Sequence, residues 1–296
     1  MRAAFSEAML QLARQHPELL LLSGDVGFRA FEGLADELGP RFINTGVAEQ
    51  MAVGLAAGLA HRGHKVFWYS IASFAVFRPL EQIRLDVCLH NLPVFIVGNG
   101  GGYGYGAMGA THHALDDLAC LSGLPNMTCY VPAYQADVPM ALNSLLQAGQ
   151  PAYLRLGLGP EGQPQPLTSL QRIQSGGRLT AVALGPMLHE VLQAAAGHDV
   201  EVWAARILPF DDSLGQLLQS LRRTRRLLVV EEHSRRGGLA EALSLALLEH
   251  GLRLEAMKAC CAQGYPQGLY GSQSYHRSLS GLDTASLTKE IQGMLA

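Results

Sequence analysis

Glu49 is the residue of this sequence whose type and surroundings most suggest chemistry. It lies in the segment Asn-Thr-Gly-Val-Ala-Glu-Gln at residues 44–50, and no other acidic residue occurs between Glu37 and Glu81. A carboxyl group in an apolar crevice can be kept protonated and can exchange a proton with a bound group. The dipole of a helix also stabilises an acidic residue in its first turn, so a structural role for Glu49 stays open.

Two aromatic residues form a second candidate. Phe74 and Phe77 are three positions apart in the apolar stretch 68–77 and would share one face of a helix. That face is compatible with ordinary core packing. It is equally compatible with a surface on which a planar heterocycle stacks.

A glycine-rich segment and the histidine that follows it form the third candidate site. Residues 98–109 contain a Gly-x-Gly-x-x-Gly pattern but do not open directly into a helix, so they give little support for a dinucleotide site. His112 follows in the sequence Thr-His-His, and adjacent histidines point in different directions, which does not fit a two-histidine metal site. His112 is therefore expected to be an acid, base or hydrogen-bond donor in a crevice, or else a solvated side chain.

The elements that must position these residues alternate between strand and helix. Apolar runs predict strands at residues 19–23, 42–45, 65–69, 93–97, 128–131, 153–156, 179–184, 200–204, 227–231 and 253–257. Apolar residues at helical spacing predict helices at 3–15, 49–60, 76–88, 114–120, 135–147, 187–196, 213–221 and 239–250, and from residue 284. Such alternation is typical of an α/β protein whose mostly parallel sheets carry helices on both faces.

A change in composition and periodicity along the sequence predicts two domains. Residues 161–178 are rich in Gly and Pro and lack clear periodicity, so they are the expected linker between domains at 1–160 and 179–296. The segment Glu-Glu-His-Ser-Arg-Arg-Gly-Gly at 231–238 ends a predicted strand and is interpreted as a structural or interface loop.

Composition limits the function classes. The 296 residues are 48% hydrophobic and 16% charged, with a net charge of -3, so nucleic acid and anionic membranes are not expected partners. No apolar run reaches membrane-spanning length, and the N-terminus does not resemble a signal peptide. Five scattered cysteines fit reduced thiols, so a cytoplasmic location is expected. So few charges also suggest that part of the surface is covered by a partner protein.

The order of these features resembles the transketolase family over nearly the whole chain. The stretches that carry the resemblance are residues 46–60, which begin Gly-Val-Ala-Glu-Gln, and residues 74–84, 109–113, 125–127, 229–233 and 237–238. The chain is similar to the C-terminal half of a transketolase, and so to the small β subunit of a split, two-component transketolase. The resemblance implies a pyrimidine-binding domain followed by a transketolase C-terminal domain. Near relatives are 1-deoxyxylulose-5-phosphate synthase and the β subunits of 2-oxo acid dehydrogenases.

This resemblance implies thiamine diphosphate as cofactor. In the family, the glutamate that matches Glu49 hydrogen-bonds N1′ of the aminopyrimidine, which assists removal of the proton from the thiazolium ring. The pyrimidine stacks on an aromatic residue that Phe77 matches best, with Phe74 in the same pocket. Asp25 and Val26 match the loop that borders the cofactor, and His112 matches a residue near the reacting oxygens.

One departure from the family implies a partner. No segment here matches the Gly-Asp-Gly…Asn motif that holds Mg²⁺ and the diphosphate. The diphosphate-binding domain and its Mg²⁺ are therefore expected on a separate α subunit, and no metal ligand is expected in this chain. The enzyme is expected to be active only as an α2β2 assembly in which the β subunits also pair with each other.

The second departure concerns substrate. The family's phosphate-binding arginine and histidine fall at Leu158 and Gly100, and the aspartate that reads a substrate hydroxyl falls at Met108. Each exchange removes a charge-assisted contact commonly worth about 1.5–3 kcal/mol. The partner chain or Arg155 would have to compensate, so an altered substrate is expected.

The predicted function is transfer of a two-carbon ketol unit from a ketose-type donor to an aldehyde-type acceptor. Two alternatives stay open: the β subunit of a 2-oxo acid decarboxylating or acyloin-forming enzyme, and a non-catalytic regulatory subunit. Because a subunit that has lost its catalytic role would be expected to lose site residues, the presence of Glu49, both phenylalanines and His112 makes the non-catalytic alternative the less favoured one.

Overall fold

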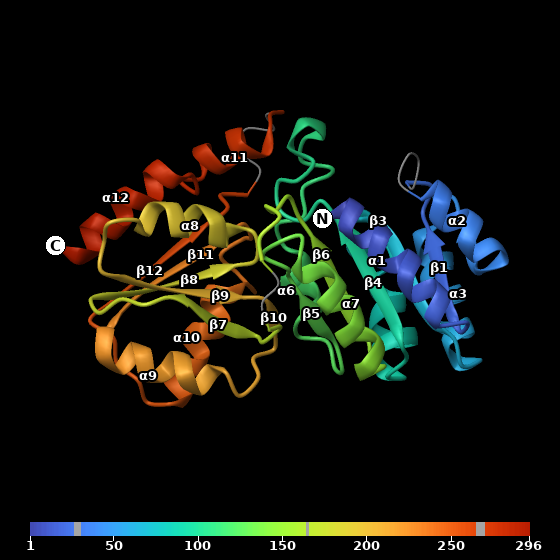
Figure 1. Ribbon diagram of the computed structural model, residues 1–296, viewed down its shortest axis with the longest axis horizontal. Helices are drawn as coiled ribbons and strands as arrows, with labels where there is room; N and C mark the ends of the chain where they lie inside the picture. The colour runs from blue at the N-terminus through green and yellow to red at the C-terminus, as the bar shows by residue number, and fades with distance from the viewer. Residues whose placement is uncertain (27–30, 164–165, 265–269) are drawn as a thin grey trace. The chain divides into compact units, whose positions relative to one another are not determined.

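The chain forms two compact units. Figure 1 shows the computed structural model, which describes residues 1–26, 31–163, 166–264 and 270–296. The first unit comprises residues 1–101 and 120–165, and the second comprises residues 102–119 and 166–296. Residues 102–119 thus group with the C-terminal unit, although the first unit precedes and follows them in sequence.

The first unit is built on parallel strands in the order β5-β6-β4-β3-β1-β2. These strands are β1 (Leu19–Ser23), β2 (Phe42–Asn44), β3 (Lys65–Ile71), β4 (Val94–Asn99), β5 (Thr128–Tyr130) and β6 (Ala152–Leu156). β1 and β6 are buried at every position, as expected for strands with both faces covered.

Helices cover both faces of this sheet. They are α1 (Arg2–Gln15), α2 (Glu32–Leu38), the 3₁₀ turn η1 (Gly39–Arg41), α3 (Glu49–His61), α4 (Ala72–Phe77), α5 (Leu80–Gln82), the π-helical η2 (Ile83–Leu89) and α7 (Asp137–Ala148). The short α6 (Asp117–Leu121) begins in the second unit and ends in the first. α1 packs against α2 and α7, whereas α3 packs against α5 and η2. Right-handed crossovers between the parallel strands are expected to place these two groups of helices on opposite faces of the sheet.

The second unit has the strand order β12-β11-β8-β9-β7. Its strands and helices are η3 (Gly106–Met108), β7 (Leu170–Gln174), β8 (Leu179–Leu184), α8 (Met187–Ala195), β9 (Val200–Ala205), β10 (Ile207–Leu208), α9 (Leu214–Thr224), β11 (Arg226–Glu231), α10 (Leu239–Glu249), β12 (Ala256–Cys261), α11 (Gln273–Leu279) and α12 (Thr284–Leu295). β7 pairs antiparallel with β9, whereas the other pairs are parallel. In Figure 1, α8 and α12 lie above this sheet and α9 and α10 lie below it.

The α/β fold class, with two mostly parallel sheets covered on both faces, is confirmed. The helix expected at 76–88 is instead divided into α4, α5 and η2, because Pro79 lacks the N–H that a continuous helix needs. The last strand lies at 256–261 rather than 253–257, since pairing of Arg226 with Ala256 and of Glu231 with Cys261 sets its register. Within the segment expected as a linker, residues 170–174 form β7.

Candidate functional site

The first unit brings its candidate residues to one edge of the sheet. β1 lies between β2 and β3, so the chain runs to one side of β1 and then crosses to the other. In open α/β sheets, ligands bind at the carboxyl ends of strands where the order reverses in this way. Asp25 follows β1, Glu49 opens α3 after β2, and Phe74 lies on α4 directly after β3.

Glu49 is a buried carboxylate with a cationic neighbour. It is the first residue of α3 and only 6% exposed. The Arg78 guanidinium donates a hydrogen bond to Glu49 Oε1 and forms an ion pair with it. Arg78 Cζ also lies 3.8 Å from the centroid of the Phe74 ring, so the same guanidinium stacks on an aromatic face. The structure therefore brings Glu49 and Phe74 together through Arg78.

Sequence reasoning missed Arg78, although a signal was present. Arg78 follows Phe74 by four positions, and residues at this spacing lie on the same face of a helix. Phe77 lies between them in sequence, at the last position of α4, and is half-buried.

Asn44 is a second residue that sequence reasoning missed. Its Nδ2 donates to Asp25 Oδ1 at 3.1 Å, and its Oδ1 accepts from the Gly46 N–H at 2.9 Å. Asn44 thereby joins the segment after β1 to the segment that leads into Glu49. Asp25 has a φ of 58°, in the left-handed region that aspartate tolerates better than most residues. Val26 follows it and is half-buried.

Three expected substrate residues lie at the ends of β4 and β6. The Gly100 N–H donates to the Leu156 carbonyl at 2.8 Å. Arg155 is 4% exposed and packs beneath Gly101, where an added Cβ would lie 2.7 Å from Arg155 Cγ. Leu158 is exposed. The residue at the family's arginine position therefore presents an apolar side chain to solvent, and Arg155 is covered by backbone.

The other two expected substrate residues lie in the 102–119 segment of the second unit. Met108 is exposed, and His112 Nδ1 lies 2.9 Å from the Thr111 hydroxyl oxygen. Glu232 fixes this segment, because its carboxylate accepts the Tyr103 N–H at 2.5 Å and also binds Arg277 and Gln273. Only glycine fits at Gly102, which has a φ of 70° and whose Cβ would collide with that carboxylate.

The neighbouring Glu231 has a different task. It is fully buried and accepts the backbone N–H groups of Leu239 at 2.7 Å and of Ala240 at 3.0 Å. These donors open α10 and would otherwise lack partners within the helix. The structural interpretation of residues 231–238 therefore holds for both glutamates.

Three aromatic rings pack where residues 102–119 meet α11. The Tyr103 and His276 rings are stacked with centroids 5.0 Å apart, and the His113 ring meets them edge-on at 5.1 and 4.8 Å. His113 and His276 are both buried. Burial first, and then the neighbouring His276, lower the pKa of His113, while Glu232 acts in the opposite direction.

We expect this cluster to make stability depend on pH. Because the pKa of His113 in the folded chain lies below its ordinary value of 6.5, the unfolded chain takes up a proton that the folded chain refuses. The free energy of unfolding should therefore fall as the pH decreases below about 6.5, until the folded pKa is reached. Urea unfolding of the full chain at pH 7.5 and pH 5.5 should show a smaller difference for His113→Gln than for the wild type. His250→Gln, at an exposed position, should leave the difference unchanged, and an equal loss in all three proteins would contradict the assignment to His113.

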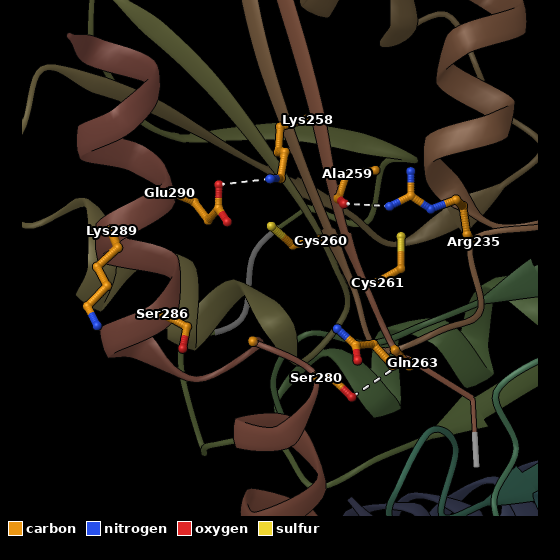
Figure 2. A pocket seen from close by; sticks show the side chains of 12 residues that line it. Arg235, Lys258, Ala259, Cys260, Cys261, Gln263, Ser280, Ser286, Lys289 and Glu290 are labelled. Carbon is orange, nitrogen blue, oxygen red and sulfur yellow. Dashed lines mark hydrogen bonds and ion pairs between the residues drawn. The ribbon is translucent and has the colours of Figure 1, made fainter. Parts of the chain in front are cut away.

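A cavity of about 550 Å³ lies elsewhere in the second unit, between β12 and α12 (Figure 2). Three of its charged groups make contacts within the protein. Lys258 pairs with Glu290 at 3.2 Å, and Arg235 donates to the Ala259 carbonyl at 3.4 Å. Burial raises the pKa of the Cys260 thiol to about 11, so at neutral pH this thiol is protonated and a poor nucleophile.

Membrane-spanning helices and clustered metal ligands are both absent from the described residues. No helix in the described ranges is long and apolar enough to cross a membrane. Within residues 1–26, 31–163, 166–264 and 270–296, no three histidine, cysteine, aspartate or glutamate side chains are grouped so that they could hold a metal ion.

Comparisons with known proteins agree with this architecture. The family described as "Transketolase, pyrimidine binding domain" matches residues 1–158, and "Transketolase, C-terminal domain" matches residues 169–275. The chain is 34% identical to one of the subunits of apulose-4-phosphate transketolase from Phocaeicola vulgatus, over 84% of each chain.

Two further relatives show which part of the enzyme this is. The chain is 31% identical to 1-deoxy-D-xylulose-5-phosphate synthase of Syntrophus aciditrophicus, over 98% of this chain but only 46% of that one. A solved structure described as "Split gene transketolase, inactive beta4 tetramer" superimposes with a TM-score of 0.87 at 29% identity, covering 99% of this chain and 97% of that one. The chain belongs to the transketolase family and is the pyrimidine-binding and C-terminal part of a transketolase-like enzyme.

Proposed function

We propose that this chain is the β subunit of a split transketolase that uses thiamine diphosphate. It transfers a two-carbon ketol unit from a ketose-type donor to an aldehyde-type acceptor, and it works only with an α subunit that carries Mg²⁺ and the diphosphate-binding domain. The observation that carries the proposal is Glu49, a buried carboxylate beside the aromatic face of Phe74 at the reversal point of the sheet. A relative that matches over 97% of its own length is described as an inactive β tetramer, which supports the need for a partner.

The residues present fit the aminopyrimidine of this cofactor. A planar group bearing N–H donors, the Arg78 guanidinium, already pairs with Glu49 and stacks on Phe74. An aminopyrimidine is also planar and can also hydrogen-bond a carboxyl group while stacking on an aromatic ring. Glu49 and Phe74 therefore offer the ring a hydrogen-bonding carboxyl group and an aromatic face on which to stack.

Each candidate site residue has a distinct role in this proposal. Glu49 hydrogen-bonds the pyrimidine at N1′ and holds the proton there. Phe74 and Phe77 provide the apolar face, and Asp25 and Val26 border the ring. When bound, thiamine diphosphate supplies the electron sink on which the two-carbon unit is carried. His112 donates hydrogen bonds to the reacting oxygens of the substrate.

The substrate is proposed to differ from ordinary sugar phosphates. Leu158 and Met108 place exposed apolar side chains where the family resemblance has an arginine and an aspartate, and Gly100 has no side chain. Arg155 is covered by Gly101, so phosphate recognition falls to the α subunit. The relative from Phocaeicola vulgatus is named for one particular sugar phosphate, apulose 4-phosphate, which supports a specialised substrate here.

An exposed apolar face is proposed to receive the α subunit. It consists of Val47, Met51 and Leu55 at and along α3, together with Leu85 and Leu89 on η2, which packs against α3. Exposed apolar side chains gathered on two elements that pack together point to an interaction site. Glu49 and Met51 both belong to the first turn of α3, so a partner that docks on this face would lie close to the helix that carries Glu49. We propose an α2β2 assembly of domains 1–160 and 179–296, with the β subunits also pairing, in the cytoplasm.

Reconstitution tests the proposal. The chain should be expressed with the product of a neighbouring gene that carries a Gly-Asp-Gly…Asn motif, and the purified pair supplied with thiamine diphosphate, Mg²⁺ and a panel of ketoses and aldehydes. We expect ketol transfer by the pair and no turnover by either subunit alone. Release of CO₂ from pyruvate without use of any ketose would replace the proposal by the 2-oxo acid alternative. Failure of the pair to bind thiamine diphosphate would leave a non-catalytic subunit.

A further inference from the structure

We propose that Arg78 is a place-holding residue: in the free subunit its guanidinium occupies the position of the aminopyrimidine ring, and it leaves that position when the cofactor binds. This inference rests on the proposed function, because it concerns the same pocket. It assigns a task to a residue that lies outside the catalytic set proposed above.

Arg78 makes both contacts that the ring needs. Its guanidinium donates a hydrogen bond to Glu49 Oε1, and its Cζ lies 3.8 Å from the centroid of the Phe74 ring. A guanidinium is planar, carries N–H donors at fixed angles and stacks on aromatic rings. In these three respects it resembles an aminopyrimidine held between a carboxyl group and an aromatic side chain.

The guanidinium and the ring exclude each other. At 3.8 Å the guanidinium is in contact with the Phe74 face, and no planar ring fits between them. The Arg78 side chain is 42% exposed, so solvent reaches the guanidinium that covers the Phe74 ring. A cofactor that approaches from solvent therefore meets the guanidinium first.

Arg78 is also able to leave. Among the described residues, it pairs with Glu49 and stacks on Phe74, and its partial exposure lets water solvate the guanidinium once it is released. Until then it is useful in place, because a buried carboxylate without a partner is strongly destabilising. Arg78 thus neutralises the charge of the Glu49 carboxylate before the cofactor binds, and its hydrogen bond to that carboxylate breaks when the cofactor takes its position.

Binding of the pyrimidine portion tests this directly. Thiamine should be titrated into the free subunit, and thiamine diphosphate with Mg²⁺ into the reconstituted pair, each by isothermal titration calorimetry. We expect Arg78→Ala to bind both about tenfold more tightly than the wild type, because no group has to be displaced; a tenfold change corresponds to about 1.4 kcal/mol. Arg78→Lys should fall between the two, since lysine keeps the charge but loses the planar stacking.

Arg84→Ala is the matched control. Arg84 lies six residues further along, is exposed and pairs with Glu81 at 3.3 Å, so its loss removes the same charge without opening the pocket. Its affinities should equal those of the wild type. Circular dichroism of all variants confirms that they are folded before they are titrated.

The outcomes separate the inference from the proposed function. If the wild-type pair binds thiamine diphosphate but Arg78→Ala binds it equally or more weakly, the place-holding role is wrong and the proposed function stands. If neither pair binds it, both fall. A crystal structure of the loaded pair gives a second reading, in which Arg78 Cζ should lie more than about 6 Å from the Phe74 centroid. A guanidinium still stacked on that face beside the bound ring would overturn the inference.

Discussion

Replacing Glu49 by glutamine is expected to abolish ketol transfer by the reconstituted enzyme. The amide keeps the size of the side chain but cannot hold the proton at N1′ of the pyrimidine, so we expect kcat to fall about 10²–10⁴-fold. Single-turnover and steady-state kinetics with the substrate found by screening measure the loss. The Glu49 side chain is buried and is not one of the exposed apolar residues of α3, so the association of the two subunits should be unchanged.

A matched variant shows whether this loss comes from chemistry. Glu37→Gln makes the same change at a carboxylate that pairs with Arg14 on the surface, and it should leave kcat within about twofold, as exposed ion pairs are weak. Analytical ultracentrifugation of the pair confirms that both variants assemble. Near-normal turnover by Glu49→Gln would remove Glu49 from the mechanism.

Replacing Met51 by lysine is expected to prevent assembly with the α subunit. Met51 is 53% exposed and belongs to the apolar face formed with Val47, Leu55, Leu85 and Leu89. An interface closing over this face would bury an unpaired ammonium group, so we expect the Kd of the subunits to rise about a hundredfold or more. Turnover should vanish at low protein concentration and return in part when the α subunit is in excess.

Leu248→Lys is the control for this change. Leu248 is 77% exposed on α10 of the second unit, so Leu248→Lys introduces the same charge at an exposed apolar position that is not part of the α3 and η2 surface. We expect it to bind the α subunit normally. Equal loss of assembly in both variants would mean that the α3 face has no special part in binding.

Much of the fold was predictable because local patterns decide it. The runs at Leu19–Ser23 and Leu179–Leu184 are apolar and bounded by turn residues, and both form strands within a residue of the prediction. The division of α4 from η2 was also readable in principle, since Pro79 interrupts the helical pattern. α11 gave no such signal, because it is short and polar and His276 is its one buried residue.

The interactions between distant segments were not predictable in this way. Arg78 and Glu49 are 29 positions apart, and their pairing depends on how α3 and α4 leave adjacent parts of the sheet. The hydrogen bond from the Tyr103 N–H to Glu232 joins residues 129 positions apart, and the local sequence around either residue does not predict it. Such contacts follow from the fold as a whole, whereas Glu49, Phe74 and Phe77 could be singled out from the local sequence, and the resemblance to a family added their expected roles.

The grouping of residues 102–119 with the C-terminal unit limits how this protein can exchange parts with its relatives. A chimaera that takes residues 1–160 from another family member as one block would import a foreign segment opposite Glu232, which binds Tyr103 and lies against Gly102. A graft that keeps residues 102–119 with their own C-terminal half would preserve those bonds. The C-terminal unit is therefore discontinuous in sequence. A chimaera that keeps it intact needs three crossover points, after residues 101, 119 and 165, rather than one.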